Sequence, residues 1–412
     1  MKNPKLFPGW YMVAASWVLV FLISSVAVSV FFKPMLEDFG WDRATFSSVQ
    51  SIALIVFTIV SPFLGRFIDR YGPRVMIFVC VATQVFSNVI NGAAGNIWHL
   101  YIARIFYGIN FVPAAQILVN RWFIKKRGTA LGIMSTGIPL GTVILVPITQ
   151  QLILLWGWRP TMFFWAAVIF VIMLPIALII KSNPGDIGYA PDGEPAVNSS
   201  PDSQSADNTG DINNSMPEGS DLSGAVKTRA FWFMSVAHFI CGISCGFIMT
   251  HIVIFATDSG YSDMIAASLV SIQGASNLAG VLITGYLSDK IVRSRVLALT
   301  HLIRSLSFAV AVIFILLGDG SLWMLYVSIA LFGFGWFTTA PLQAGLVADL
   351  FGNLRMGTIL GLETSCHHFG MALGAYLGGA VFEISGSYFP VFLTLGLLEL
   401  LAVGLFLSIR QK

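Results

Sequence analysis

Long uncharged hydrophobic runs alternate with short polar segments along the whole chain. Twelve runs can be delimited, at Met12–Phe32, Thr45–Phe67, Val75–Asn91, Ile97–Asn120, Gly128–Gln150, Thr161–Ile180, Ala230–Ala256, Met264–Leu287, Val296–Leu317, Leu322–Ala348, Gly357–Phe382 and Phe389–Ile409. Each run has the roughly 20 mostly apolar residues that an α-helix needs to cross about 30 Å of hydrocarbon. The pattern therefore predicts an all-α membrane protein with twelve transmembrane helices.

Basic residues are distributed unequally between alternate connecting segments. If the N-terminus is placed in the cytoplasm, eighteen of the 23 lysines and arginines fall on cytoplasmic segments and three on the opposite side. The remaining two, Arg104 and Arg304, lie inside hydrophobic runs. Such an excess in cytoplasmic loops is typical of helical membrane proteins. We therefore expect both termini in the cytoplasm and a multi-pass protein of the cell, or inner, membrane.

The composition also indicates a membrane protein. Hydrophobic residues make up 56% of the chain, charged residues 10%, and the mean hydropathy is +0.80, which excludes an ordinary soluble domain. The net charge of +3 comes from loops expected in the cytoplasm, so the expected partner is the lipid bilayer and not a nucleic acid. Cys241 and Cys245 share a helix face, with no other soft ligand nearby in the sequence. We expect buried, unreactive thiols and no metal.

A polar, acidic segment divides the chain into two halves. Residues 182–229 are rich in Asn, Ser, Gly, Asp and Pro and cannot bury enough apolar surface to offset their conformational entropy. We expect a disordered cytoplasmic linker there. It would connect an N-terminal six-helix bundle at 1–181 to a C-terminal six-helix bundle at 230–412.

Short motifs recur in the two halves at nearly constant offsets. Segment 65–70 (GRFIDR) follows the second run, and segment 285–290 (GYLSDK) follows the eighth. Segment 128–132 (GTALG) likewise matches segment 357–361 (GTILG). Parallel repeats of six helices predict two pseudo-symmetric bundles, with a substrate site near the bilayer midplane between them.

Segment 65–74, with the sequence GRFIDRYGPR, resembles the loop 2–3 signature of the major facilitator superfamily. Its glycines permit a tight turn and close helix approach, and its charged side chains can hold loop backbone and a neighbouring helix end. The resemblance implies the major facilitator fold and a latch that stabilises the outward-facing state. The residues expected to form the latch are Gly65, Asp69, Arg70, Gly72 and Arg74, with Asp289 in the second half.

A narrower resemblance, to the monocarboxylate transporter and oxalate/formate antiporter branches, is carried by segments 8–10 (PGW), 30–35 (VFFKPM), 39–44 (FGWDRA), 121–123 (RWF) and 125–132 (KKRGTALG). It implies transport of a small organic anion, and we expect a monocarboxylate. Monocarboxylate transporters typically carry an Asp and an Arg one turn apart in the eighth helix, whereas segment 264–288 has no charged residue here. The charge that balances an anion must therefore come from elsewhere.

Polar residues inside the hydrophobic runs are the candidates for a substrate site. In the eighth helix, Gln273 and Asn277 share a face, which either lines a cavity or serves amide-mediated packing between helices. His251 lies near the outer end of the seventh helix, where substrate binding and plain interfacial placement are both open. The fourth and tenth helices offer Asn110, Gln116, Trp336, Thr338, Thr339 and Gln343.

His367 in the eleventh helix has chemistry suited to both a proton and an anion, because histidine titrates near neutral pH. It lies about 16 Å from the inner end of its helix, near the bilayer midplane, and shares a face with Glu363. By our alignment it occupies the position of a substrate-binding Lys in oxalate-transporting relatives. We expect His367 to bind substrate and to couple protons together with Glu363 and Arg104. His368 points to another face and should matter less.

Charged residues at membrane depth need partners. Arg304 lies at a depth similar to that of Glu399 and could also approach Glu363, so we expect a structural ion pair. Arg104 belongs to a helix that faces the centre of the expected fold. Structural and functional roles are equally open for it.

These features predict a secondary active transporter that moves a small organic acid together with a proton through a central site, by alternating access. Anion exchange, or export of a neutral or hydrophobic compound, is an alternative, and a transporter-like membrane sensor is an alternative of another class. The sequence contains neither a Walker-type loop nor His-Glu-x-x-His. We therefore expect no enzymatic activity and no cofactor, and a transporter that functions as a monomer.

Overall fold

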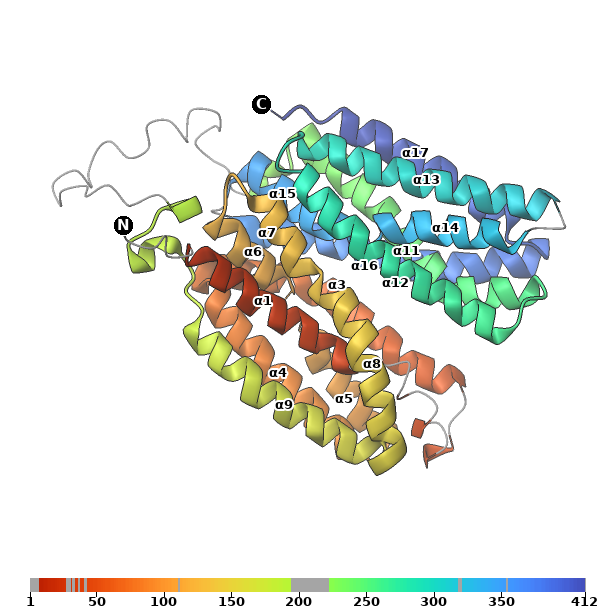
Figure 1. The fold of residues 1–412 in the computed structure, drawn as a ribbon, viewed down its shortest axis with the longest axis horizontal. Helices are drawn as coiled ribbons and strands as arrows, with labels where there is room; N and C mark the ends of the chain where they lie inside the picture. Colours follow the sequence, from red (N-terminus) through yellow and green to blue (C-terminus); the bar gives the residue numbers. More distant parts are fainter. Residues whose placement is uncertain are drawn as a thin grey trace, which may run out of the picture.

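Two groups of helices lie side by side and make up the protein (Figure 1). The computed structural model describes residues 7–26, 31, 34–35, 38–40, 43–109, 112–193, 222–317, 321–352 and 355–411. The helices before residue 194 form one group, coloured red to yellow-green, and those after residue 221 form the other, coloured green to blue. We call these groups the first and the second half. The start of α1 and the end of α17 lie at the same end of the molecule. We call it the basic end, because the connecting segments on the side of the two termini carry most of the lysines and arginines.

The helices of the first half are α1 (Gly9–Ile23), η1 (Ser24–Val26), α3 (Arg43–Tyr71), α4 (Pro73–Gly92), α5 (Ile97–Tyr107), α6 (Val112–Trp122), α7 (Arg127–Ser135), α8 (Gly137–Trp156) and α9 (Trp158–Ile179). Those of the second half are α11 (Arg229–Asp258), α12 (Asp263–Leu287), α13 (Arg293–Leu317), α14 (Leu322–Gly335), α15 (Thr339–Phe351), α16 (Met356–Ser385) and α17 (Phe389–Leu407). Short helices η2 (Pro184–Ile187), η3 (Pro191–Gly193) and α10 (Leu222–Ala225) lie between the halves in sequence.

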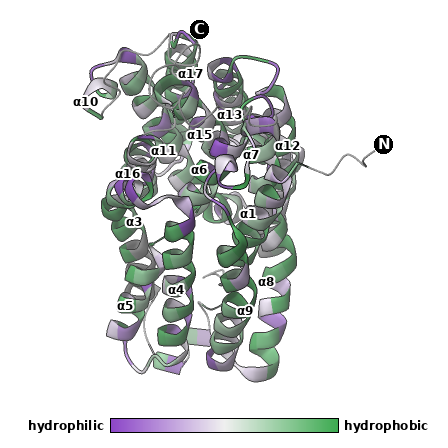
Figure 2. Ribbon diagram, turned by 90° about the vertical axis from the view of Figure 1, so that its left-hand side faces the viewer, coloured by the Kyte–Doolittle hydropathy of each residue, from purple (hydrophilic) through white to green (hydrophobic). Residues whose placement is uncertain are grey.

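Nine helical segments of the described residues are long and apolar enough to cross a membrane, and α1 is a shorter apolar helix. Helices α3 and α16 have 29 and 30 residues. The prediction of an all-helical membrane protein is confirmed at this level, while the total of twelve spans stays a prediction. Hydrophobic residues predominate along α4, α8 and α9 (Figure 2). Exposed side chains such as Leu154 and Ile179 therefore face the position of lipid.

Three of the expected spans are each divided into two helices. The fourth is α5 and α6, the fifth is α7 and α8, and the tenth is α14 and α15. The residue after α14, Trp336, has ψ −80°, outside the helical range. Non-helical backbone at membrane depth is tolerated where it is buried or lines a cavity, and residues 336 and 337 line the cavity described below.

Glycines allow helices of the two halves to touch through their backbones at the basic end. A Cβ atom on Gly65 of α3 would lie 2.0 Å from the carbonyl oxygen of Gly357 in α16, and one on Gly128 of α7 would lie 2.5 Å from that of Gly285 in α12. No side chain fits at such distances, so both crossings require glycine. The repeated segments seen in the sequence thus form the contacts between the halves.

The segment 182–229, predicted to be a disordered linker, is in part ordered. Residues 182–193 fold back onto the first half, where a carboxylate oxygen of Asp192 accepts hydrogen bonds from the backbone N–H groups of Ile124 (3.0 Å) and Lys125 (2.8 Å). Asn183 accepts a hydrogen bond from Arg121. These polar contacts replace the apolar burial that the segment lacks. Residues 194–221, on which the rest of this prediction falls, lie outside the described part of the chain.

Candidate functional site

Asp69, near the end of α3, caps the N-terminus of α16 in the other half. Its carboxylate accepts hydrogen bonds from the backbone N–H groups of Gly357 (2.7 Å) and Thr358 (2.8 Å) and from the Thr358 hydroxyl (2.6 Å). Both N–H groups belong to the first turn of α16, where no carbonyl of the helix itself can accept them. The helix dipole also favours a carboxylate there. Asp69 therefore ties the halves together at the basic end.

Asp289, just after α12, makes the matching contact in the opposite direction. It accepts hydrogen bonds from the backbone N–H groups of Gly128 (2.6 Å) and Thr129 (2.8 Å), in the first turn of α7. The aspartate of each half thus caps a helix of the other half.

Asp349, in the last turn of α15, adds an ionic contact at the same end. It pairs with Arg127 of the first half at 2.8 Å and with Arg293 of its own half. Gln411 donates a further hydrogen bond to it, at 3.2 Å. Both arginines are largely buried, so the shared carboxylate lies among groups that are only partly screened by water.

The other residues of the predicted latch shape the loop between α3 and α4. Gly72 has a φ of +85°, a left-handed conformation that favours glycine. Arg74 donates a hydrogen bond to the carbonyl of Leu178 at 2.7 Å, and the Arg70 guanidinium lies 5.3 Å from the ring centre of Tyr71. These contacts stay within the first half, whereas Gly65 and Asp69 make the contacts across the halves.

A cavity of about 410 Å³ lies between the two halves. Its described lining consists of Ile23, Ser24, Phe57, Tyr107, Val112, Pro113, Gln116, Ile138, Thr142, His238, Met249, Trp336, Phe337, Thr339, Ala340, Leu360, Thr364, His367, His368 and Met371. This set includes no Asp, Glu, Lys or Arg. The walls are therefore mainly apolar and aromatic, with a few polar side chains, of which the three histidines are the ones that titrate near neutral pH, as is usual for a site that encloses a small molecule.

Three histidines face the cavity from the second half. The ring centres of His238 and His367 lie 4.7 Å apart, and those of His367 and His368 lie 5.3 Å apart. His368 donates a hydrogen bond from Nδ1 to the Thr364 carbonyl at 2.8 Å, and its ring centre lies 4.3 Å from that of Phe57 in the first half. His367 and His368 point to different sides of α16, as the sequence predicts, but both line the cavity.

Glu363 lies one layer behind these histidines, fully buried. It accepts hydrogen bonds from Ser235 (2.5 Å) and Gln343 (3.1 Å), and its Oε2 is 3.7 Å from Nδ1 of His238. It does not line the cavity. The order Glu363, His238, His367 leads from a buried carboxylate to the cavity wall.

Arg104 lies beside the cavity without an acidic partner among the described residues. It is 1% exposed, and its Nε and Nη1 atoms make no hydrogen bond within the described chain. Its guanidinium lies 5.3 Å from the ring centre of Tyr107, which lines the cavity. A buried cation without a counter-ion is costly at membrane depth, so this wall favours an anion nearby.

Arg304 forms the buried ion pair expected from its depth. Its Nη2 lies 3.1 Å from Oε1 of Glu399, and His301 Nδ1 lies 2.6 Å from the second carboxylate oxygen. Arg304 therefore pairs with Glu399 and not with Glu363, the other carboxylate that the sequence offered. Glu363 is hydrogen-bonded to Ser235 and Gln343 instead.

Several residues predicted to bind substrate lie away from the cavity. Asn277 donates a hydrogen bond to the Gly333 carbonyl at 3.1 Å, and the backbone of Gln273 packs against the same glycine, so this part of α12 contacts α14. Both ring nitrogens of His251 are engaged, with Tyr388 (3.2 Å) and the Ala375 carbonyl (2.9 Å). Asn110 lies outside the described residues.

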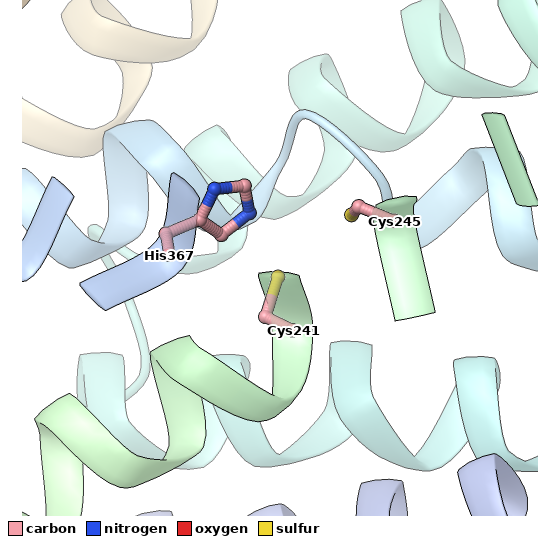
Figure 3. Close-up of side chains that lie close together, drawn as sticks. All are labelled: Cys241, Cys245 and His367. Carbon is pink, nitrogen blue, oxygen red and sulfur yellow. The ribbon is translucent and has the colours of Figure 1, made fainter. Parts of the chain in front are cut away.

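Cys241 and Cys245 of α11 meet His367 of α16 next to the cavity (Figure 3). One possible ligand atom from each residue lies within 4.8 Å of the other two. Nη1 of Arg304 lies 2.7 Å from the Cys241 sulfur, which in turn lies 3.5 Å from the Thr339 hydroxyl. The sequence predicts no further metal ligand near the cysteine pair. The fold places His367 there, although it lies 122 residues after Cys245 in the chain.

Sequence reasoning missed His238, Tyr107 and Phe57. A signal existed for His238, which lies three and seven residues before Cys241 and Cys245, on the same helix face. Tyr107 and Phe57 stand in apolar runs, where no pattern separates a cavity wall from ordinary packing.

Comparison with known protein families assigns this arrangement to a class. The model of the Major Facilitator Superfamily matches residues 13–375. The chain therefore belongs to this superfamily and is a multi-pass membrane transporter, not an enzyme. Members of the superfamily bind small-molecule substrates.

Individual relatives agree with the narrower resemblance seen in the sequence. The chain is 26% identical to the uncharacterized MFS-type transporter YcxA of Bacillus subtilis, over 92% of this chain and 90% of that protein. It is 23% identical to monocarboxylate transporter 13 of Bos taurus, over 97% and 89%. It is 22% identical to the oxalate:formate antiporter of Oxalobacter formigenes, over 92% and 88%.

Among solved structures, the chain is similar to the major facilitator transporter FucP in the outward conformation, with a TM-score of 0.72 and 14% identity over 97% of this chain and 98% of that one. This similarity establishes the fold.

Proposed function

We propose that the protein is a secondary active transporter that carries a small organic monocarboxylate together with a proton across the cell, or inner, membrane. The observation that carries the proposal is the cavity between the halves, whose described lining has three histidines and no Asp, Glu, Lys or Arg. Imidazole is the side chain suited to gain and lose a proton near neutral pH. A protonated His367 binds a carboxylate by a charge-assisted hydrogen bond and releases it on deprotonation.

Positive charge near the cavity supports an anionic substrate. Arg104 is buried beside Tyr107 with no acidic partner in the described chain, and an anion in the cavity would supply one. Glu363 and His238 stand behind His367 in the order that a proton path requires. The relatives named for monocarboxylate and oxalate:formate transport support the same substrate class.

The proposal includes a topology and a conformation. The basic loops and both termini lie in the cytoplasm, residues 182–229 connect two six-helix bundles on that side, and the protein works as a monomer. The hydrogen bonds from Asp69 and Asp289 to the opposite halves then close the cytoplasmic side, which corresponds to an outward-facing state. Alternating access requires both caps to break.

The aromatic and thioether lining favours a second candidate, the export of a hydrophobic compound. Phe57, Met249, Trp336, Phe337 and Met371 surround the histidines, and such surfaces bind apolar ligands by burial.

Uptake of labelled short monocarboxylates into proteoliposomes tests the proposal. An inward-directed pH gradient at clamped membrane potential should drive accumulation, which a protonophore abolishes. Uptake that requires a preloaded counter-anion and ignores the pH gradient would indicate exchange instead. Binding of hydrophobic cations or dyes without any monocarboxylate uptake would favour the export alternative.

A further inference from the structure

We propose that Cys241, Cys245 and His367 form a binding site for a soft monovalent metal ion, Cu(I). The two cysteines lie one turn apart on α11, and the histidine comes from α16, so the site joins two helices of the second half. The proposal concerns binding alone and does not depend on which substrate is transported.

The geometry needs only a small adjustment to bind an ion. The possible ligand atoms lie within 4.8 Å of one another. The centre of such a triangle is about 2.8 Å from each corner, whereas metal–sulfur and metal–imidazole bonds measure about 2.0–2.3 Å. Side-chain movements of about half an ångström, well within rotamer freedom, would bring all three donors to one ion.

The backbones of α11 and α16 hold the three donors in place. A Cβ atom on Gly242 would lie 2.0 Å from the carbonyl oxygen of His367, so the two helices are in direct contact beside the cluster. Donors carried by rigid, touching helices are preorganised for a metal.

The choice of metal follows from the donors and their neighbours. Thiolates with a single imidazole select soft ions such as Cu(I). Structural zinc sites use four protein ligands, and three-ligand zinc sites, such as those with two cysteines and one histidine, take a water or substrate molecule as the fourth ligand. Apart from the other two members of the cluster, the described groups in contact with the sulfur of Cys241 are the Arg304 guanidinium and the Thr339 hydroxyl, neither of which is a usual zinc ligand. A three-donor site therefore favours Cu(I).

Arg304, which also pairs with Glu399, places positive charge beside the site. Binding of Cu(I) releases the two thiol protons and leaves one net negative charge on the two thiolates and the ion. Nη1 of Arg304 already lies 2.7 Å from the Cys241 sulfur, where a guanidinium stabilises negative charge on sulfur. The cavity, lined by His367 and Thr339, gives the ion a path to the site.

Copper binding to the purified full-length protein tests the proposal. Titration of Cu(I) against the chelator bicinchoninate, under anaerobic reducing conditions, should show one ion bound per chain. Replacing both thiols (Cys241→Ser with Cys245→Ser) should lower the affinity at least 100-fold, and His367→Ala should lower it at least tenfold. The matched controls Cys80→Ser and Cys366→Ser, which change the chain's other two cysteines, should bind like the parent.

X-ray absorption at the copper edge provides a readout in the parent protein, in case the double variant does not fold. The expected first shell contains two sulfur atoms and one nitrogen atom. A parent protein that binds no Cu(I) would overturn the proposal, as would an unchanged affinity in the double cysteine variant or in His367→Ala, or a first shell without sulfur.

Discussion

The carboxylate of Asp69 accepts hydrogen bonds from both the backbone N–H and the hydroxyl of Thr358, a residue that lies 289 positions later in the chain. Thr358 stands in the first turn of α16, so a side chain of the first half completes a helix of the second. The four repeated segments form two such caps. Segments 65–70 and 285–290 supply the aspartates, and segments 357–361 and 128–132 supply the helix N-termini that the aspartates cap. The cap is thus a structural contact between the halves, and in the proposed transport cycle it is a contact that must break when the halves separate.

Asp69→Asn should insert normally yet lose most transport activity. The amide keeps the volume but removes the charge, which we expect to destabilise the closed basic end by about 1–2 kcal/mol, roughly a 5- to 30-fold shift in the conformational equilibrium. Uptake rates and spin-label distances across the basic end measure the effect. The exposed Glu383 supplies the control, as Glu383→Gln. Parent-like uptake by Asp69→Asn would show that the cap plays no part in cycling.

Asp289→Asn should shift the same equilibrium by a similar amount, because its two hydrogen bonds to α7 match those of Asp69 to α16. The two caps contact different helices, so their effects on free energy should add to within about 0.5 kcal/mol. Spin-label populations in the two single variants and the double variant give this sum. A double variant no more open than either single variant would mean that one cap alone controls closure.

His367→Gln should abolish uptake driven by a pH gradient, because glutamine can donate a hydrogen bond to an anion but cannot carry a proton. His367→Lys should retain some anion binding while losing its dependence on pH. Proteoliposome uptake at several external pH values separates the two variants, and the exposed His99 provides the control as His99→Gln. If His367→Gln responds to pH like the parent, Arg104 becomes the next residue to test.

Glu399→Gln should lower thermal stability strongly, because it leaves the buried Arg304 guanidinium without its counter-ion. Breaking one side of a buried pair costs about 3–5 kcal/mol. The double change Arg304→Met with Glu399→Gln should recover much of this loss, because no buried charge is left unpaired. Melting temperatures of detergent-purified variants measure both effects. A double variant as unstable as Glu399→Gln would argue against the ion pair as the cause.

Single cysteines introduced at Ser200 and Ser215 should resist membrane-impermeant thiol reagents in intact cells and react once the cells are opened. The expectation follows from the excess of basic residues in the loops on the same side and tests the topology directly. Labelling of either position from outside intact cells would reverse the proposed orientation.

The sequence specified most helices but not where they break. Hydrophobic length alone predicts a span at Leu322–Ala348, and the structure has α14 and α15 there, with non-helical backbone at Trp336. A helix can stop inside a membrane only where its free backbone groups are buried or face a cavity. That condition depends on neighbouring helices and is invisible in a single run of apolar residues.

The candidate site was predictable in part. The depth and chemistry of His367 in the sequence led to the cavity wall where the structure places it. The polar face of Gln273 and Asn277 was equally compatible with a cavity and with packing, and the structure places it against α14. An amide satisfied by a neighbouring backbone and an amide facing a cavity give the same periodicity, so periodicity cannot separate the two.

By itself, the sequence determined the class of protein. A membrane requires long apolar helices, which hydrophobic length reveals, and the glycine and aspartate motifs at the helix ends recur in both halves of the sequence. Only the tertiary structure decided how those motifs pair. Asp69 and Asp289 each reach across to the opposite half, and His367 meets Cys241 and Cys245 across two helices. The physical reason is that hydrophobic patterns fix which residues enter the membrane, whereas contacts between distant segments depend on helix crossings. Those crossings are set here by glycine-to-backbone distances that no local pattern encodes.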